Sequence, residues 1–313
     1  MKRNTTTRRR FLKTAAASAV ALPFASLAKH HAASDWRPLF DGKTLEGWKA
    51  TPRINVAGQL GKASSRDAVN SAIERVLTHH RNNDTDLYRH LGKWEVVDGA
   101  IEGGQDPVGS RMGAYLLTEE TFGDFELEYE MRPDWQTDTG IYIRQHPVGT
   151  VGIQVLCDHR PNGGIGGFFT NGLGSYIAAP FFVDGDEGEN YTVENLREGE
   201  FASSFPQAKI SGAATFEQFR DIWKVNDWNR FRLRCVGANP VITTWINDLE
   251  IATLDSSDTG IEGYDPAIIG QRVGDRGHIG LEIHSNNPKR GWTQWAQGAV
   301  SRWRNIRVRE LSS

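Results

Sequence analysis

Cysteine, long apolar stretches and surplus positive charge are all scarce in this sequence. Two of its 313 residues are cysteines, Cys157 and Cys235, and no cysteine–histidine spacing typical of a zinc site occurs. After the first thirty residues, no stretch is apolar enough to form a transmembrane helix. These absences argue against a disulfide-rich scaffold, a zinc-binding module and a helical membrane protein.

The two cysteines permit one disulfide if the chain reaches an oxidising compartment. Both lie inside β-rich runs, and the spacing around them is not that of a disulfide framework. Two small buried strand residues are therefore the favoured interpretation. The sequence leaves a bond between Cys157 and Cys235 open.

The first 28 residues have the features of an export signal. The motif RRRFLK at 8–13 matches the twin-arginine pattern, an alanine-rich apolar stretch follows, and SLA at 26–28 offers small residues for cleavage. We expect residues 1–28 to be a twin-arginine signal peptide and the remaining chain to be periplasmic or secreted.

The chain without this signal is acidic. The whole sequence has 36 Lys and Arg against 39 Asp and Glu, and residues 1–28 hold six of the bases and no acid. The remainder has 30 bases against 39 acids, a net charge of −9. This balance argues against nucleic acid, whose phosphates require a basic face, and suits a protein that meets a neutral ligand. Neither a membrane partner nor a particular oligomeric state is indicated.

Short alternating runs predict strands rather than helices. The chain has 33 glycines and 10 tryptophans, and in residues 125–132 Phe125, Leu127 and Tyr129 alternate strictly with charged residues. We expect one all-β domain over 34–313, with a helical insertion at about 51–92 and a long loop insertion at about 159–227. The first insertion contains a serine, Ser65, suited to cap a helix.

Four segments together resemble the 3-keto-disaccharide hydrolase domain family. Their order and spacing carry the resemblance, which spans residues 36–311. The segments are LFDGKTLEGW at 39–48, GDFEL at 123–127 with GIYIR at 140–144, DWNR at 227–230 with WIND at 245–248, and GHIGLEIH at 277–284 with RNIRVREL at 304–311.

The resemblance implies a concanavalin-A-like jelly-roll sandwich of two antiparallel sheets whose concave face holds a sugar. It also implies a glycoside-cleaving enzyme whose substrates are disaccharides or other glycosides oxidised to a ketone at C3. This sequence departs from the family pattern at Glu282, where the family commonly has glutamine. A non-catalytic carbohydrate-binding module is the alternative, because sandwich folds serve lectins as well as enzymes.

Three residues are our candidates for proton transfer. A C3 ketone makes the C2 proton acidic, so a base can remove it and the C1 substituent can leave, with water adding afterwards. His284 is the preferred base or acid because imidazole titrates near neutral pH. Asp158 is a second candidate, and Glu130 is the third because paired carboxylates on one strand are typical of sandwich glucanases. Each is equally compatible with sugar binding or structural pairing.

Side chains that share a strand face with these candidates are expected to bind the substrate. Strand parity places Glu282 on the same strand face as His284, and it places Arg144 on the face opposite to two buried isoleucines. Tryptophans in loop-like segments are suited to stack on sugar rings. A divalent cation is a possible cofactor, with no diagnostic ligand spacing. The expected substrate-binding residues are Arg144, Gln154, Glu282, Glu128 and Trp292.

Overall fold

The computed structural model describes residues 36–61, 65–83, 89–184, 191–199, 205–212, 214–287, 289 and 291–312. The expected signal peptide at 1–28 lies outside these residues. None of the helices in the described part combines the length and apolar character needed to cross a membrane.

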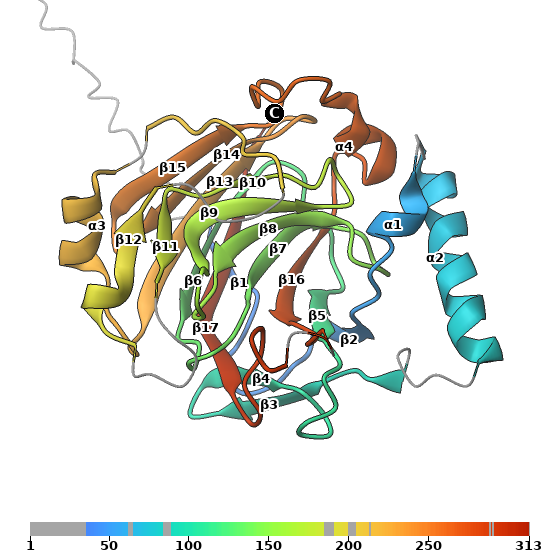
Figure 1. Ribbon diagram of the computed structural model, residues 1–313, viewed down its shortest axis with the longest axis horizontal. Helices are drawn as coiled ribbons and strands as arrows, with labels where there is room; N and C mark the ends of the chain where they lie inside the picture. The colour runs from blue at the N-terminus through green and yellow to red at the C-terminus, as the bar shows by residue number, and fades with distance from the viewer. Residues whose placement is uncertain are drawn as a thin grey trace, which may run out of the picture. The chain divides into compact units, whose positions relative to one another are not determined.

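Two antiparallel sheets form the fold, as predicted (Figure 1). In the described residues, sheet A has the strand order β15-β14-β13-β6-β17-β4-β3 with β1 paired to β17, and sheet B has the order β12-β11-β9-β8-β7-β16-β5-β2 with β10 paired to β9. Sheet A consists of β1 (Arg37–Pro38), β3 (Lys93–Val97), β4 (Ala100–Gly104), β6 (Phe125–Met131), β13 (Asn229–Val236), β14 (Val241–Ile246), β15 (Leu249–Asp255) and β17 (Val300–Glu310). Sheet B consists of β2 (Trp48–Pro52), β5 (Ala114–Thr118), β7 (Gly140–Gln145), β8 (Gly152–Cys157), β9 (Gly164–Asn171), β10 (Ile177–Ala178), β11 (Phe181–Val183), β12 (Leu196–Glu198) and β16 (His278–Ile283).

The core lies between the sheets and follows from strand alternation. On β6 the apolar residues Phe125, Leu127 and Tyr129 are buried in it, and on β16 the buried Ile279 and Leu281 belong to the same cluster. Because successive side chains of a strand point to opposite faces, the residues between these positions lie on the outer faces of the two sheets. Any site on sheet B other than a loop site is therefore built on its outer face.

The second of two helices in the segment 51–92 begins at the serine that was predicted to cap a helix. Helix α1 spans Ala57–Leu60 and α2 spans Arg66–Asn82. The Ser65 side chain accepts a hydrogen bond from the Ala68 amide at 3.1 Å, which satisfies one of the free N–H groups at the start of the helix. The buried residues of α2, among them Val69 and Ile73, join the main core.

The segment 159–227 is more ordered than the sequence indicated. It contributes β9 to β12 to sheet B, and it contains the short helix η2 (Val193–Asn195) and the helix α3 (Phe216–Ile222). Gly164 and Gly167 lie within β9, where a Cβ at Gly167 would meet the Ala178 carbonyl oxygen at 2.4 Å. The glycines thus permit close strand packing.

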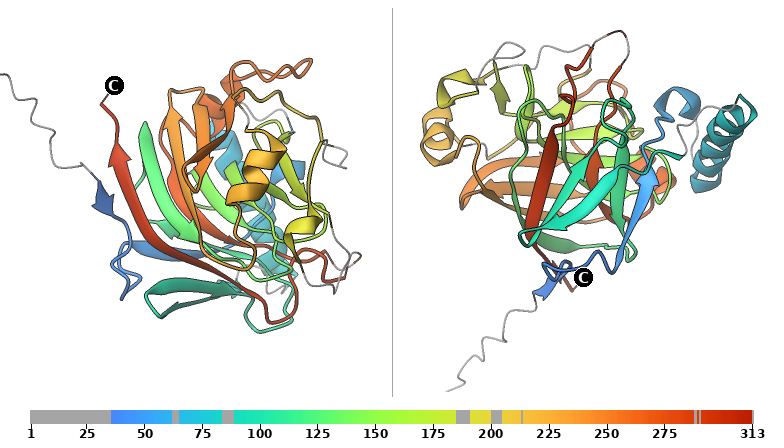
Figure 2. Two further views of the ribbon diagram at one scale, coloured as in Figure 1. Left: turned by 90° about the vertical axis from the view of Figure 1, so that its left-hand side faces the viewer. Right: turned by 90° about the horizontal axis from the view of Figure 1, so that it is seen from below.

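Helix α3 lies on the opposite side of the sandwich from α1 and α2 (Figures 1 and 2). The remaining helix, α4, spans Ala267–Arg272 and contacts α2. Both cysteines are free and buried, Cys157 on sheet B and Cys235 on sheet A.

Candidate active site

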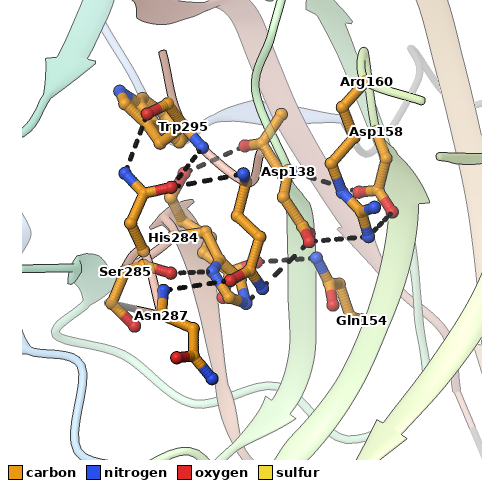
Figure 3. A network of polar contacts seen from close by, with 12 residues as sticks. Asp138, Gln154, Asp158, Arg160, His284, Ser285, Asn287 and Trp295 are labelled. Atoms are coloured by element: carbon orange, nitrogen blue, oxygen red, sulfur yellow. Dashed lines mark hydrogen bonds and ion pairs between the residues drawn. The ribbon is translucent and has the colours of Figure 1, made fainter. Parts of the chain in front are cut away.

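A group of seven polar side chains meets on the outer face of sheet B, and we call it the polar centre. Figure 3 labels Asp138, Gln154, Asp158, Arg160 and His284 of this group. The strand register brings these residues together from distant positions: Glu282 lies opposite Tyr115 on β5, and Gln154 lies opposite Tyr142 on β7. The members of the polar centre are Arg53, Asp138, Gln154, Asp158, Arg160, Glu282 and His284.

Glu282 is the best-coordinated side chain of the polar centre, and it is completely buried. Arg53 Nε donates to its Oε1 at 2.7 Å, and Gln154 Nε2 donates to its Oε2 at 2.6 Å. The hydroxyls of Tyr115 and Tyr142 donate to Oε1 at 3.3 and 3.4 Å. Four donors therefore fix this carboxylate in one position.

Burial changes the pKa of Glu282 more strongly than these hydrogen-bond donors do. Removal from water raises the pKa of Glu282 to about 7, although the charge and hydrogen bond of Arg53 oppose the rise. Near neutral pH this carboxyl therefore exists in both protonation states. A group of that kind changes the charge of the polar centre within the physiological range.

His284 follows the end of β16 and is held as a neutral imidazole. Its Nδ1 lies 2.6 Å from the carbonyl oxygen of Ser285, so Nδ1 carries the proton and donates it. Its Nε2 is then an acceptor, and it lies 2.8 Å from Arg53 Nη2. Burial, followed by the positive charge of Arg53, lowers the pKa of His284 to about 4. The imidazole consequently presents a lone pair at Nε2 at neutral pH.

Asp138 and Asp158 form a carboxyl pair around Arg160, as Figure 3 shows. Arg160 Nη2 lies 2.8 Å from Asp138 Oδ2 and 3.7 Å from Asp158 Oδ2. Burial and then the neighbouring Asp138 raise the pKa of Asp158 well above its ordinary value. Burial also acts on Asp138, but Arg160 and the other nearby positive groups outweigh it and lower the pKa of Asp138. A proton on this pair is therefore favoured on Asp158 over Asp138.

Solvent reaches the polar centre along one edge. The side chains of Arg160, His284 and Asp138 are 18%, 13% and 9% exposed, whereas that of Glu282 is 0% exposed. Asp138 Oδ2 and His284 Nε2 are 4.0 Å apart at this edge. The Arg53 side chain, at 8%, is about as exposed as that of Asp138, so a small ligand that approaches from solvent meets these four side chains before Glu282.

Four residues predicted from the sequence belong to the polar centre: His284, Asp158, Gln154 and Glu282. Glu128 and Glu130 do not. They lie on the outer face of sheet A, where Arg307 Nε donates to Glu128 at 2.9 Å and Arg304 Nε donates to Glu130 at 2.7 Å. This placement separates both residues from the polar centre, and a role of Glu130 in catalysis and of Glu128 in binding stays a prediction. Strand alternation correctly placed Glu128 and Glu130 on one face of β6, but β6 belongs to sheet A, whereas the polar centre lies on sheet B.

Arg144 is also displaced from its expected position. Strand parity placed it beside Tyr142 on the outer face, yet its φ of 52° reverses the alternation at the end of β7. Its fully buried side chain donates from Nη2 to the Gly237 carbonyl at 2.9 Å and lies 3.5 Å from Asp124. Arg144 therefore connects the sheets near β13 and does not reach the polar centre.

Trp292 lies in the segment that follows His284, and it is half-buried. Arg111 stacks on it, with the guanidinium carbon 4.9 Å from the ring centroid. This placement leaves its predicted role as a sugar platform a prediction. Trp295, a second tryptophan of this segment, is fully buried and donates from Nε1 to the Ala299 carbonyl oxygen. It is a packing residue.

Sequence reasoning missed Arg53, Asp138 and Arg160. Arg53 directly follows β2, and Asp138 lies between β6 and β7 in a segment without regular alternation. Arg160 had a usable signal, because Asp158 and Arg160 flank a single residue directly after β8. In the described part of the chain, no group of three or more His, Cys, Asp or Glu side chains is arranged to hold a metal ion.

A comparison with protein families identifies the chain. Residues 35–309 match the model of the 3-keto-alpha-glucoside-1,2-lyase-like domain. The chain belongs to this family. None of the curated proteins matches it in sequence.

Solved structures resemble this lyase-like domain only distantly. A putative glycosyl hydrolase from Parabacteroides distasonis is 12% identical, with 88% of this chain and 94% of that chain covered and a TM-score of 0.43. A β-1,3-1,4-glucanase derived from a mouse hindgut metagenome is 15% identical, with 69% and 82% covered and a TM-score of 0.36. A carbohydrate-binding module from Bacillus subtilis is 11% identical, with 69% and 89% covered and a TM-score of 0.34.

Proposed function

We propose that this lyase-like domain cleaves disaccharides or other glycosides that carry a ketone at C3, by elimination followed by hydration. The observation that carries the proposal is the juxtaposition in the polar centre of a neutral imidazole and a carboxyl pair: His284 Nε2 lies 4.0 Å from Asp138 Oδ2, and the pKa of the neighbouring Asp158 is raised. Elimination from a ketosugar needs one group that accepts a proton and one that donates it, and His284 and the Asp138–Asp158 pair offer both. Family membership supports the same chemistry.

His284 is the proposed base. In the free protein its Nε2 lone pair accepts a hydrogen bond from Arg53. When the substrate binds, the C2 proton takes the place of that donor, and the guanidinium of Arg53 turns to the C3 oxygen. Negative charge develops on this oxygen as the enolate forms, and a buried guanidinium stabilises it strongly because little water competes.

The Asp138–Asp158 pair is the proposed acid, with Arg160 holding the two carboxyl groups together. The C2–H and C1–O bonds break, a C1=C2 double bond forms, and the pair donates its proton to the departing oxygen. Water then adds across C1=C2, with its proton at C2 and its hydroxyl at C1, and yields the free 3-keto sugar. No oxidant or reductant is needed, and the net reaction is hydrolysis.

The test uses 4-nitrophenyl 3-keto-α-glucoside, its unoxidised counterpart and a C2-deuterated form of the ketone. We expect the ketone alone to be cleaved, with loss of deuterium to solvent, and His284→Gln to lower kcat/KM by about 10²- to 10⁴-fold. Retention of deuterium at C2 in the product, or equal cleavage of the unoxidised glucoside, contradicts the proposal. Saccharide binding without cleavage of any ketone supports the non-catalytic binding module instead.

The requirement for a divalent cation is tested in the same cleavage assay. The reaction is run with and without EDTA, and loss of activity that Mg²⁺, Mn²⁺ or Zn²⁺ restores supports a divalent cation.

For export, we propose that residues 1–28 direct the chain through the twin-arginine route. Replacement of Arg8 and Arg9 by lysine is expected to keep the protein in the cytoplasmic fraction of a bacterial host, and normal export of this variant rejects that route.

A further inference from the structure

A cavity separate from the polar centre lies beside the segment that carries Asp138. Its volume is about 530 Å³, within the range of about 300–1,000 Å³ that is typical of small-molecule sites. One wall is formed by residues 132–135 and the other by residues 296–299. None of the seven residues of the polar centre lines it.

The two walls are joined to the polar centre by backbone pairing. Asp138 N donates to the Gln294 carbonyl at 2.7 Å, and Ala296 N donates to the Gln136 carbonyl at 2.8 Å. Thr137 and Trp295 form an antiparallel bridge between these contacts. The cavity and Asp138 thus lie along the same pair of chain segments. Trp135, which lines the cavity, precedes Asp138 by three residues.

The lining has the composition that binds sugar hydroxyls. Trp135 is an aromatic residue of the lining, and its ring stacks in parallel on Tyr191 with centroids 5.2 Å apart and planes 6° from parallel. This stack holds the indole in one orientation. Asn226 and Gln297 are exposed at the cavity, and an amide both donates and accepts hydrogen bonds as a hydroxyl does.

The charges in the lining favour a neutral ligand over an anion. Arg302 lies in the cavity wall, but its Nε donates to Glu102 at 2.6 Å and its Nη1 donates to Asp134 at 2.6 Å. Arg132 stacks over Trp228, with 5.2 Å between the guanidinium carbon and the ring centroid. An anion would have to compete with two carboxylates for Arg302, whereas a hydroxyl accepts or donates without displacing either.

We infer that this cavity is a second saccharide-binding site, which takes a neutral sugar unit against Trp135 with Asn226 and Gln297 bonded to its hydroxyl groups. The inference does not depend on the chemistry proposed for the polar centre. An unoxidised saccharide binds there equally well, since no ketone is needed for stacking or for amide hydrogen bonds.

The test measures binding of unoxidised trehalose, maltose, cellobiose and maltotriose to the whole protein by saturation-transfer NMR and titration calorimetry. We expect at least one of them to bind, and Trp135→Ala to weaken its Kd about tenfold or more, since removal of the ring loses at least about 1.4 kcal/mol. Gln297→Ala, which changes an exposed side chain, is expected to weaken Kd about threefold to tenfold without a change in melting temperature.

Two matched variants separate this site from others. Trp245→Ala removes a tryptophan on the outer face of sheet A, where Arg232 stacks on it, and is expected to leave Kd unchanged. His284→Gln alters the polar centre and is expected to retain the binding. The inference is overturned if no saccharide of the panel binds, or if binding survives both Trp135→Ala and Gln297→Ala. Cleavage of the ketone without binding at the cavity supports the proposed function and rejects the second site. Binding at the cavity without cleavage of the ketone supports the second site and rejects the proposed function.

Discussion

Replacement of Glu282 by glutamine changes how the stability of the protein depends on pH. Glutamine keeps the shape of the side chain, and its amide oxygen still accepts from Arg53, but it does not titrate. In the wild type the carboxyl has a pKa of about 7 when folded, because of burial, and about 4.5 when unfolded. Between these values the folded state binds more protons than the unfolded state, so the contribution of Glu282 to stability falls as pH rises.

The size of the change follows from the two pKa values. The interval from 4.5 to about 7, at about 1.4 kcal/mol per pH unit, corresponds to about 3 kcal/mol. The contribution of protonated Glu282 is complete below pH 4.5 and is lost as pH rises through 7. The free energy of unfolding of Glu282→Gln, relative to wild type, is therefore expected to increase by about 3 kcal/mol between pH 4.5 and pH 7.5.

Urea unfolding followed by tryptophan fluorescence at several pH values measures this difference. His284→Gln is the matched comparison with the opposite sign. The folded pKa of His284, about 4, lies below its ordinary value of 6.5, so its contribution to stability is present above pH 6.5 and is lost as pH falls towards 4. Relative to wild type, the free energy of unfolding of His284→Gln should therefore increase as pH falls from 6.5 towards 4. A difference between Glu282→Gln and wild type that is flat with pH refutes our account of this carboxyl.

Three other substitutions test the placement of residues outside the polar centre. Glu130→Gln removes the partner of Arg304 on sheet A and is expected to lower stability by about 1 kcal/mol in urea unfolding while the rate of ketone cleavage stays within twofold; a large rate loss contradicts the placement. Arg144→Met breaks a buried contact with Asp124 and the Gly237 carbonyl, and thermal unfolding should show a loss of about 3 kcal/mol; an unchanged melting temperature would falsify that contact. Gly140→Ala places a Cβ 2.1 Å from the Val155 carbonyl oxygen, so we expect little soluble protein, and normal expression with a wild-type melting temperature excludes the clash.

The sheet architecture was predictable because alternation is a local property. In β6 the positions of Phe125, Leu127 and Tyr129 predict the buried face without any knowledge of the neighbouring strands. Alternation does not reveal which of two sheets a strand joins. Glu128 and Glu282 both oppose apolar residues on their own strands, but only the pairing of β16 with β5 and β7 brings Glu282 to the polar centre.

Residues of the polar centre outside regular strands were not predictable in this way. Arg53 and Asp138 follow no periodic pattern, and their contacts depend on how the chain turns after β2 and before β7. Arg144 shows the converse failure: it lies within a strand, yet one residue with positive φ sends its side chain to the other side. A periodic rule fails wherever the backbone leaves the extended conformation.

Arg53, in the polar centre, lies along the chain just before the helical insertion. It hydrogen-bonds Glu282 and His284, and four residues further on the chain enters the helical insertion of α1 and α2. Detachment of those helices would pull on the only guanidinium that contacts both side chains in the described structure, while the strands of both sheets kept their pairing. Changes in the length or packing of this insertion therefore offer a route to adjust reactivity without rebuilding the scaffold that supports it.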